Sequence, residues 1–164
     1  MPDTCERNLH PLGGFLVRRI TLSVDDALAE RFEAWAKAHG YAQRSEAFRD
    51  LLRERLEREL VESEEGHCVA SLTYVYNHHE RHLAERLTEH QHRHHTTCLS
   101  TVHVHLDADH CLEVQLLKGR IAAMRRYADT LLAERGVSHG HLHLVPVQRH
   151  GPEEDAHVHY TPAV

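Results

Sequence analysis

Residues 101–111 have the sequence Thr-Val-His-Val-His-Leu-Asp-Ala-Asp-His-Cys, which predicts a β-hairpin. Side chains alternate between the two faces of a strand, so His103 and His105 should share one face. Residues 107–110 lack strand character and should form the loop, which places Cys111 opposite His105 on the returning strand. Two imidazoles and a thiolate would then meet, and this donor set suits a borderline or soft metal better than calcium or magnesium.

Histidine is unusually frequent in this chain, with 19 histidines among 164 residues. Strand histidines and a buried cysteine also occur without any metal, and histidine-rich segments often form only a polar surface. The clustering of histidines between His78 and His110, next to the predicted hairpin, favours a metal site over these alternatives. The four cysteines include no Cys-x-x-Cys pair, so we expect free thiols or metal ligands and no disulfide framework.

Length and composition allow one domain or two small ones, with enough apolar residues (41%) for a packed core. The sequence has no run of eighteen apolar residues and no secretory leader, which predicts a cytoplasmic protein without a membrane partner. Acidic and basic residues balance in residues 1–53, so the net charge of −6 arises from the remainder. An acidic chain binds nucleic acid poorly without a local basic patch that is repeated by oligomerisation.

The N-terminal third predicts a flexible arm (1–16) followed by one strand and two helices (17–60). Asp25 and Asp26 favour the start of the first helix, and Gly40 is placed to end it. Residues 17–24 alternate in polarity, with Ile20, Leu22 and Val24 on one face of the strand and Arg19, Thr21 and Ser23 on the other.

A single strand cannot stand alone, because its edges and its apolar face need partners. The simplest solution is a dimer in which two copies of the strand pair antiparallel. Such a ribbon fits the major groove of DNA, where Arg19, Thr21 and Ser23 could contact base edges. The alternative is that these three residues form only the polar face of an ordinary strand.

The remainder predicts a short linker (61–67), a second domain (68–147) and a flexible tail (148–164). The second domain should contain strands and helices in the order β-α-β-β-α-β, which is a ferredoxin-like arrangement. Its expected elements are a strand at 69–76, a helix at 80–90, hairpin strands at 97–106 and 111–117, a helix at 119–135 and a strand at 138–147.

Residues Arg19–Asp25, Gly40-Tyr41 and Arg44–Leu52 together resemble a ribbon-helix-helix DNA-binding domain. With the second domain included, nearly all of residues 17–147 resembles the nickel-responsive transcriptional regulators (NikR). The motifs that carry this resemblance are Tyr74-Val-Tyr76, His78, the histidine-rich helix end, Val102–His105, Cys111-Leu-Glu113, Leu117-Lys-Gly119 and Gly136–Leu142. The resemblance implies an α+β protein with an N-terminal ribbon-helix-helix (βαα) dimerising domain and a C-terminal ferredoxin-like, ACT-type βαββαβ domain.

The resemblance also implies a ligand set and an assembly. His103, His105 and Cys111 of one subunit would bind Ni(II) in a square plane with His92 of another subunit. The protein would be a homotetramer, a dimer of dimers, that binds a palindromic operator in double-stranded DNA when nickel is present. Matching positions further place Glu46 and Asp50 near a bound cation and link His78 to the nickel response.

Three functions are therefore open. The first is a nickel-dependent repressor of nickel-uptake genes, which is not an enzyme. The second is a histidine-rich store or chaperone for metal, which would leave the ribbon-helix-helix pattern without a use. The third is a metallohydrolase with water as the fourth ligand, which would need a general base, and neither Asp107 nor Glu113 lies in a motif for one.

Overall fold

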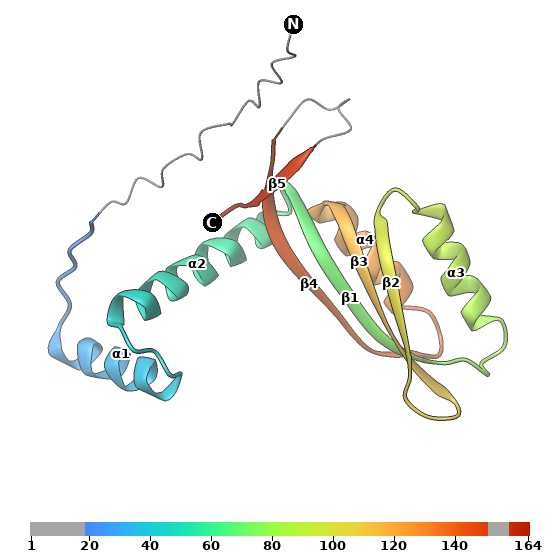
Figure 1. The fold of residues 1–164 in the computed structure, drawn as a ribbon, viewed down its shortest axis with the longest axis horizontal. Coiled ribbons are helices and arrows are strands. Elements are labelled where there is room, and N and C mark those ends of the chain that lie inside the picture. The colour runs from blue at the N-terminus through green and yellow to red at the C-terminus, as the bar shows by residue number, and fades with distance from the viewer. Residues whose placement is uncertain (1–18, 151–157) are drawn as a thin grey trace, which may run out of the picture. The chain divides into compact units, whose positions relative to one another are not determined.

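The computed structural model describes residues 19–150 and 158–164, so the predicted N-terminal arm (1–16) lies outside the described residues. The described chain forms two compact units that divide between Arg44 and Ser45 (Figure 1). The first unit contains helix α1 (Asp26–Ala38), and the second begins within the first turn of helix α2 (Arg44–Ser63).

The bounds of α1 agree with the sequence prediction at both ends. Asp25 caps the helix, because its carboxylate accepts a hydrogen bond of 2.9 Å from the backbone N–H of Leu28. At the other end Gly40 follows the C-cap residue His39 and has a φ of +78°, a conformation that favours glycine. The local signals in the sequence are therefore sufficient to define this helix.

The predicted strand at 17–24 is not a strand in the single chain, and this prediction needs correction. Residues 19–25 have no regular secondary structure, and residues 17 and 18 lie outside the described part. The physical reason is that a strand is defined by hydrogen bonds to a neighbouring strand. Among the described residues, this segment pairs with none.

Helix α2 extends to Ser63, so it includes the first residues of the predicted linker (61–67). Only Ala47 of this helix is buried. The apolar side chains at helical spacing are each 36–43% exposed, namely Phe48, Leu51, Leu52, Leu56 and Leu60. None of the described helices is long and apolar enough to cross a lipid bilayer.

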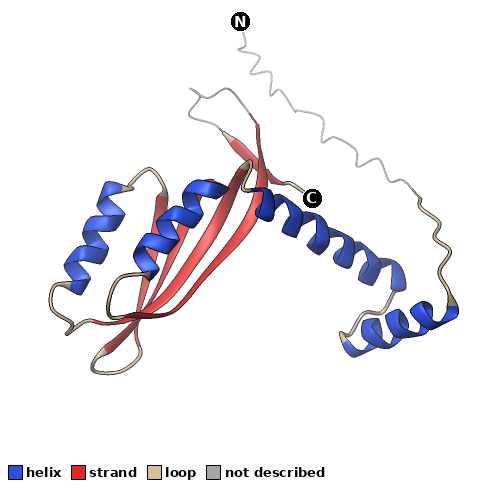
Figure 2. Cartoon of the chain, turned by 180° about the vertical axis from the view of Figure 1, so that it is seen from behind, coloured by secondary structure: helices blue, strands red, loops and turns tan. Residues whose placement is uncertain are grey.

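The second unit is built on an antiparallel sheet with strand order β2-β3-β1-β4-β5. Helices α3 and α4 connect the strands as crossovers and lie on one face of the sheet (Figure 2). The element order β-α-β-β-α-β confirms the predicted ferredoxin-like fold. The bounds are β1 (His67–Asn77), α3 (Leu83–Arg93), β2 (Cys98–His105), β3 (His110–Arg120), α4 (Ile121–Leu132), β4 (Val137–His150) and β5 (His159–Pro162).

The hydrophobic core lies between the sheet and the two helices. Every second residue of β1 is buried, as the period of a strand dictates. Leucines of α3 and apolar residues of α4 pack on these side chains in one cluster. Its principal members are Leu72, Tyr74, Leu83, Leu87, Ile121, Met124, Tyr127 and Leu131. Full burial of one such side chain contributes about 1.5–3 kcal/mol, so this core can hold the unit together within one chain.

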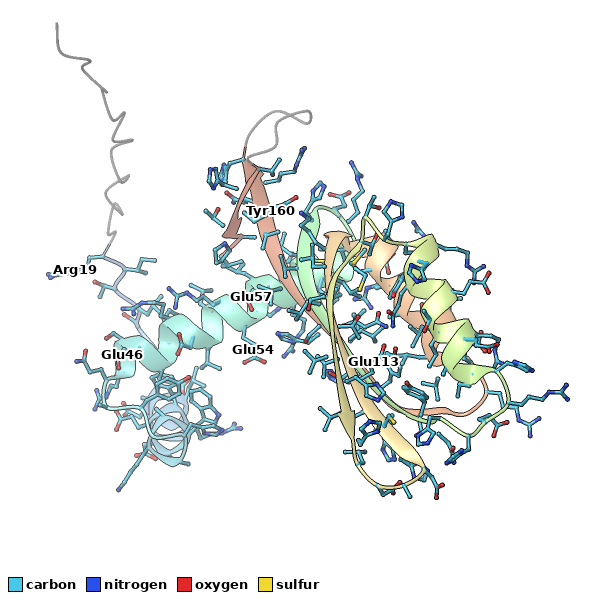
Figure 3. All side chains as sticks on the ribbon, turned by 45° about the vertical axis from the view of Figure 1, so that its right-hand side comes forward. Arg19, Glu46, Glu54, Glu57, Glu113 and Tyr160 are labelled. Carbon is cyan, nitrogen blue, oxygen red and sulfur yellow. The ribbon has the colours of Figure 1, made fainter. Side chains whose placement is uncertain are left out.

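The predicted flexible tail (148–164) is wrong for most of its described residues. Residues 148–150 belong to β4, and the chain returns as β5, with Val147 opposite Pro162 and His150 opposite His159. The ring of Tyr160, labelled in Figure 3, lies 5.3 Å from the ammonium group of Lys118. Strand hydrogen bonds and this cation–π contact give the segment an order that its composition did not indicate.

Candidate metal centre

The hairpin of β2 and β3 places two of the predicted ligands opposite one another. His105 pairs with Cys111 across the ladder, and Nδ1 of His105 lies 3.4 Å from Sγ of Cys111. The loop is closed by Asp107, whose Oδ1 accepts hydrogen bonds from the N–H groups of Asp109 (2.8 Å) and His110 (2.7 Å). This local turn fixes the register of the two strands, so the predicted pairing is confirmed.

His78 supplies the third donor of a cluster whose ligand atoms, with those of His105 and Cys111, all lie within 4.8 Å of one another. Its Nδ1 lies 3.4 Å from Sγ of Cys111. The N–H of His78 donates to the carbonyl of Asp109 at 3.0 Å, which holds the chain after β1 against the hairpin loop. The sequence indicated only a secondary role for His78, because its distance along the chain from the hairpin concealed this proximity.

His103 lies beside this three-donor cluster (His78, His105 and Cys111) and is not part of it. Its register partner is Glu113, and its Nδ1 lies 3.6 Å from a carboxylate oxygen of that residue. The ring centroids of His103 and His105 are 4.9 Å apart. The structure therefore brings His105 and Cys111 together as predicted, with His78 in contact and His103 adjacent.

Glu113, labelled in Figure 3, connects strand β3 to helix α3 through a hydrogen bond from Gln91. Its side chain is 7% exposed and accepts hydrogen bonds from the Tyr74 hydroxyl (2.6 Å), Gln91 Nε2 (2.5 Å) and Gln115 Nε2 (3.2 Å). A buried carboxylate needs such donors to offset the loss of water. Sequence reasoning did not assign this role, although Glu113 lies two residues after Cys111 and therefore on the same face of β3.

His92 is exposed on α3 and shares a surface hollow with Ala84, Glu85 and Glu89. It does not belong to the three-donor cluster of its own chain. The neighbouring Gln91 reaches Glu113, so the end of α3 that carries His92 is tied to β3. A ligand role for His92 requires a second copy of the chain and stays a prediction.

The thiol of Cys111 must lose its proton before it can bind a metal. Burial, together with the nearby carboxylates of Asp107 and Glu113, raises the pKa of this thiol. The cluster therefore holds a protonated cysteine at neutral pH until a cation displaces the proton. A thiolate with imidazole nitrogens is a donor set that fits nickel, copper or zinc, so the residues present fit a transition metal.

The predicted DNA-contacting residues Arg19, Thr21 and Ser23 are all exposed, and Arg19 projects from its segment in Figure 3. The apolar residues between them are exposed as well: Ile20 by 64%, Leu22 by 56% and Val24 by 54%. Both faces of this segment are thus open to solvent in the single chain. Its use in DNA binding stays a prediction.

The predicted cation residues Glu46 and Asp50 both lie on α2. Glu46 is exposed, and Asp50 forms an ion pair of 3.4 Å with Arg53 one turn later. Among the described residues, neither belongs to a group of three metal-binding side chains. Their role near a bound cation stays a prediction.

Comparison with known proteins covers both parts of the chain. The family model described as the NikR C-terminal nickel-binding domain matches residues 69–145, and that of the ribbon-helix-helix proteins of the CopG family matches residues 18–59. A protein of Rhodopseudomonas palustris (strain TIE-1), named "putative nickel-responsive regulator", is 41% identical over 143 residues, which are 87% of this chain and 97% of the relative.

A protein of the same name from Trichlorobacter lovleyi is 46% identical over 128 residues, or 78% of this chain and 92% of the relative. These relatives carry the name of regulators, which confirms the prediction that the chain is not an enzyme.

Proposed function

Because the chain belongs to the family of nickel-responsive regulators, with a ribbon-helix-helix domain and a nickel-binding domain, we propose that it represses nickel-uptake genes. In this proposal it binds a palindromic operator in the cytoplasm when Ni(II) occupies the metal centre. The active form is a homotetramer, a dimer of ribbon-helix-helix dimers.

The observation that carries the proposal is the convergence of His105, Cys111 and a further imidazole at one end of the sheet. We assign the nickel ligands as His103, His105 and Cys111 of one copy with His92 of a second copy. The 4.9 Å between the rings of His103 and His105 supports this set. His78, whose Nδ1 lies 3.4 Å from the same sulfur, is available as an alternative ligand.

A ligand from a second copy gives nickel a way to act on the assembly. Gln91 joins the end of α3 to Glu113, and His92 follows directly in sequence. A metal bound by His92 of one copy and Cys111 of another would therefore restrain two chains relative to each other. Nickel would shift the population of tetramers toward the form that fits the operator, limited by its preference for that form.

The DNA-binding part of the proposal rests on apolar side chains that one chain leaves exposed. Ile20, Leu22 and Val24 are more than half exposed, and five apolar residues of α2 are also open. Pairing of residues 19–24 with a second copy would cover the apolar face and present Arg19, Thr21 and Ser23 together. A two-stranded ribbon of this kind fits the major groove.

The deciding experiment is DNA binding by the full-length, metal-free protein across a panel of divalent metals. Duplexes selected from a random pool in the presence of nickel would be retested with no metal and with manganese, cobalt, nickel, copper and zinc. We expect tight, specific binding with nickel and its loss in Cys111→Ala. Equal binding with and without metal, or in the variant, would refute the proposal.

A further inference from the structure

A second cavity lies between the C-terminal end of α3 and helix α4, and none of the three-donor cluster lines it. Its volume is about 380 Å³. This size is within the range of sites that hold small molecules, which is roughly 300–1,000 Å³. Polar lining residues come from both helices and from the turn after α3, namely His90, Arg93, His94, Thr97, Arg126 and Thr130.

His90 is a buried polar residue that lines this cavity with one nitrogen unpartnered. The residue is 8% exposed, and its Nε2 has no hydrogen-bond partner. The ring is held between two other lining residues, with centroids 4.7 Å from His94 and 4.5 Å from Tyr127. Buried polar groups without a partner are rare in folded proteins, and each calls for an explanation such as an absent ligand or ion.

The charged residues that line the cavity indicate the charge of that ligand. Arg93 and Arg126 form no ion pair with any other residue in the described part of the chain, and no acidic side chain lines the cavity. A metal cation would be repelled by the two guanidinium groups. A guanidinium instead binds carboxylate or phosphate oxygens through paired N–H groups.

The rest of the lining offers a hydrogen-bond donor and some apolar surface to a small oxyanion. The backbone of Thr97 is fixed, because its N–H donates to the carbonyl of His94 (2.8 Å) and its carbonyl accepts from Lys118 (2.9 Å). Its hydroxyl is available as a hydrogen-bond donor at the cavity. Ala123, Met124 and Tyr127 add apolar surface to the same cavity.

We propose that this cavity, between the end of α3 and α4, binds a small oxyanion, either a carboxylate or a phosphate. Arg93 and Arg126 neutralise its charge, and Thr97 and His90 offer further hydrogen bonds. This inference goes beyond the proposed function, because it needs neither nickel nor DNA. The regulator would then bind a small metabolite in addition to nickel.

The test uses the full-length protein, freed of metal on a chelating resin so that no soluble chelator competes as an anion. Inorganic phosphate and citrate would be titrated separately by calorimetry in Tris chloride at constant ionic strength. We expect saturable binding at one site per chain for at least one of the two. The tighter of the two identifies the ligand as phosphate-like or carboxylate-like.

The matched variants are Arg126→Gln and Arg81→Gln, since both side chains are exposed and both changes remove one positive charge. Arg126→Gln should weaken anion binding about tenfold, the effect of losing a hydrogen bond to a charged group. Arg81→Gln, which lies outside the cavity, should leave it unchanged. An equal loss in both, or no saturation with either anion, would overturn the proposal.

A second variant, His90→Leu, tests the buried nitrogen by thermal unfolding. In anion-free buffer this change should raise the Tm, because it removes an unpartnered buried polar group. The increase in Tm that phosphate or citrate gives the wild type should be smaller in the variant, because one hydrogen bond to the anion is lost. If a DNA duplex binds this surface in an Arg126-dependent manner while both anions fail, the surface is a nucleic-acid contact and the proposal is wrong.

Discussion

The ferredoxin-like sheet and the segment before α1 have the same alternation of apolar and polar residues, yet they differ completely in burial. In β1, Leu72 and Tyr74 are fully buried beneath α3 and α4. In residues 19–24, Ile20 and Leu22 are 64% and 56% exposed. The single chain buries the apolar residues of the first pattern and leaves those of the second exposed.

This difference fits the division of labour in a metal-dependent regulator. A metal centre must be preorganised, and here a hairpin turn and a buried carboxylate network hold its side chains in place. A DNA-reading ribbon, in contrast, exists only when two chains meet. In the proposed function, the apolar residues of this segment form the contact between two chains, and the single chain leaves them exposed.

The difference in burial between the two regions can be tested by truncating one leucine in each. Leu72→Ala should lower the free energy of unfolding by about 2–5 kcal/mol, because it leaves a cavity in the core. Leu22→Ala should change the stability of the sheet by less than about 0.5 kcal/mol, because Leu22 belongs to a different unit of the chain and makes no contact in the sheet's core. Hydrogen exchange of the β1 amides would measure both. Equal losses of hydrogen-exchange protection in the two variants would contradict the conclusion that the sheet folds independently of residues 19–24.

The same contrast explains what the sequence could predict. Within the second domain, the signals are local or follow from strand periodicity. Asp107 closes the hairpin, and β1 alternates in burial, so the fold and the pairing of His105 with Cys111 were predicted correctly. The strand at 17–24 was predicted from the same periodicity, but a strand also needs hydrogen bonds to a neighbouring strand, and residues 19–24 pair with none of the described residues.

Two features of the site could not be found from pattern alone. His78 reaches Cys111 only because the end of β1 lies beside the start of β3, with Asn77 opposite His110. Strand β5 forms because the chain after His150 returns to pair with β4. Both depend on contacts between separate segments of the chain, and the sequence of residues 148–164 indicated only a flexible tail.

A smaller effect should separate the regions by function. Arg19→Ala should weaken operator binding by about 1–3 kcal/mol, the usual value of a bidentate contact to a base. Nickel affinity should stay unchanged, because Arg19 and the three-donor cluster belong to different units. Fluorescence anisotropy with operator DNA and a nickel titration would measure the two properties. Arg81→Ala is the control for loss of charge, and an Arg19→Ala protein with full operator affinity would remove Arg19 from the interface.

Coupling between the regions should depend on His92. His92→Ala keeps His103, His105 and Cys111, so it should retain some nickel affinity while losing most of the nickel-dependent operator binding. Nickel raises the affinity for operator DNA by some factor, and linkage requires that operator DNA raise the affinity for nickel by the same factor. The corresponding coupling free energy is typically about 1–3 kcal/mol. Both factors should fall together in the variant. If the His92→Ala protein binds operator DNA in response to nickel as the wild type does, His92 is only a polar residue of the helix and not a ligand. His95→Ala, in the same histidine-rich helix end, is the matched control.

The smallest effect concerns the proton that nickel displaces. Burial and the carboxylates of Asp107 and Glu113 raise the pKa of Cys111, so the thiol is protonated at neutral pH. Nickel binding must then release that proton, and apparent affinity should rise with pH, by about tenfold per pH unit for one proton.

Cys111→Ala isolates this contribution, because it removes the titrating thiol and keeps the imidazoles. In the wild type, nickel should produce a thiolate charge-transfer band, and nickel affinity should climb as the pH rises from neutral, because the pKa of the Cys111 thiol is raised. In the variant the band should be absent, and affinity should rise less steeply over the same range of pH. An unchanged band would exclude Cys111 as a ligand. If nickel affinity rises equally steeply with pH in the variant, another group releases the proton, and Cys111 is not the titrating ligand of the metal site.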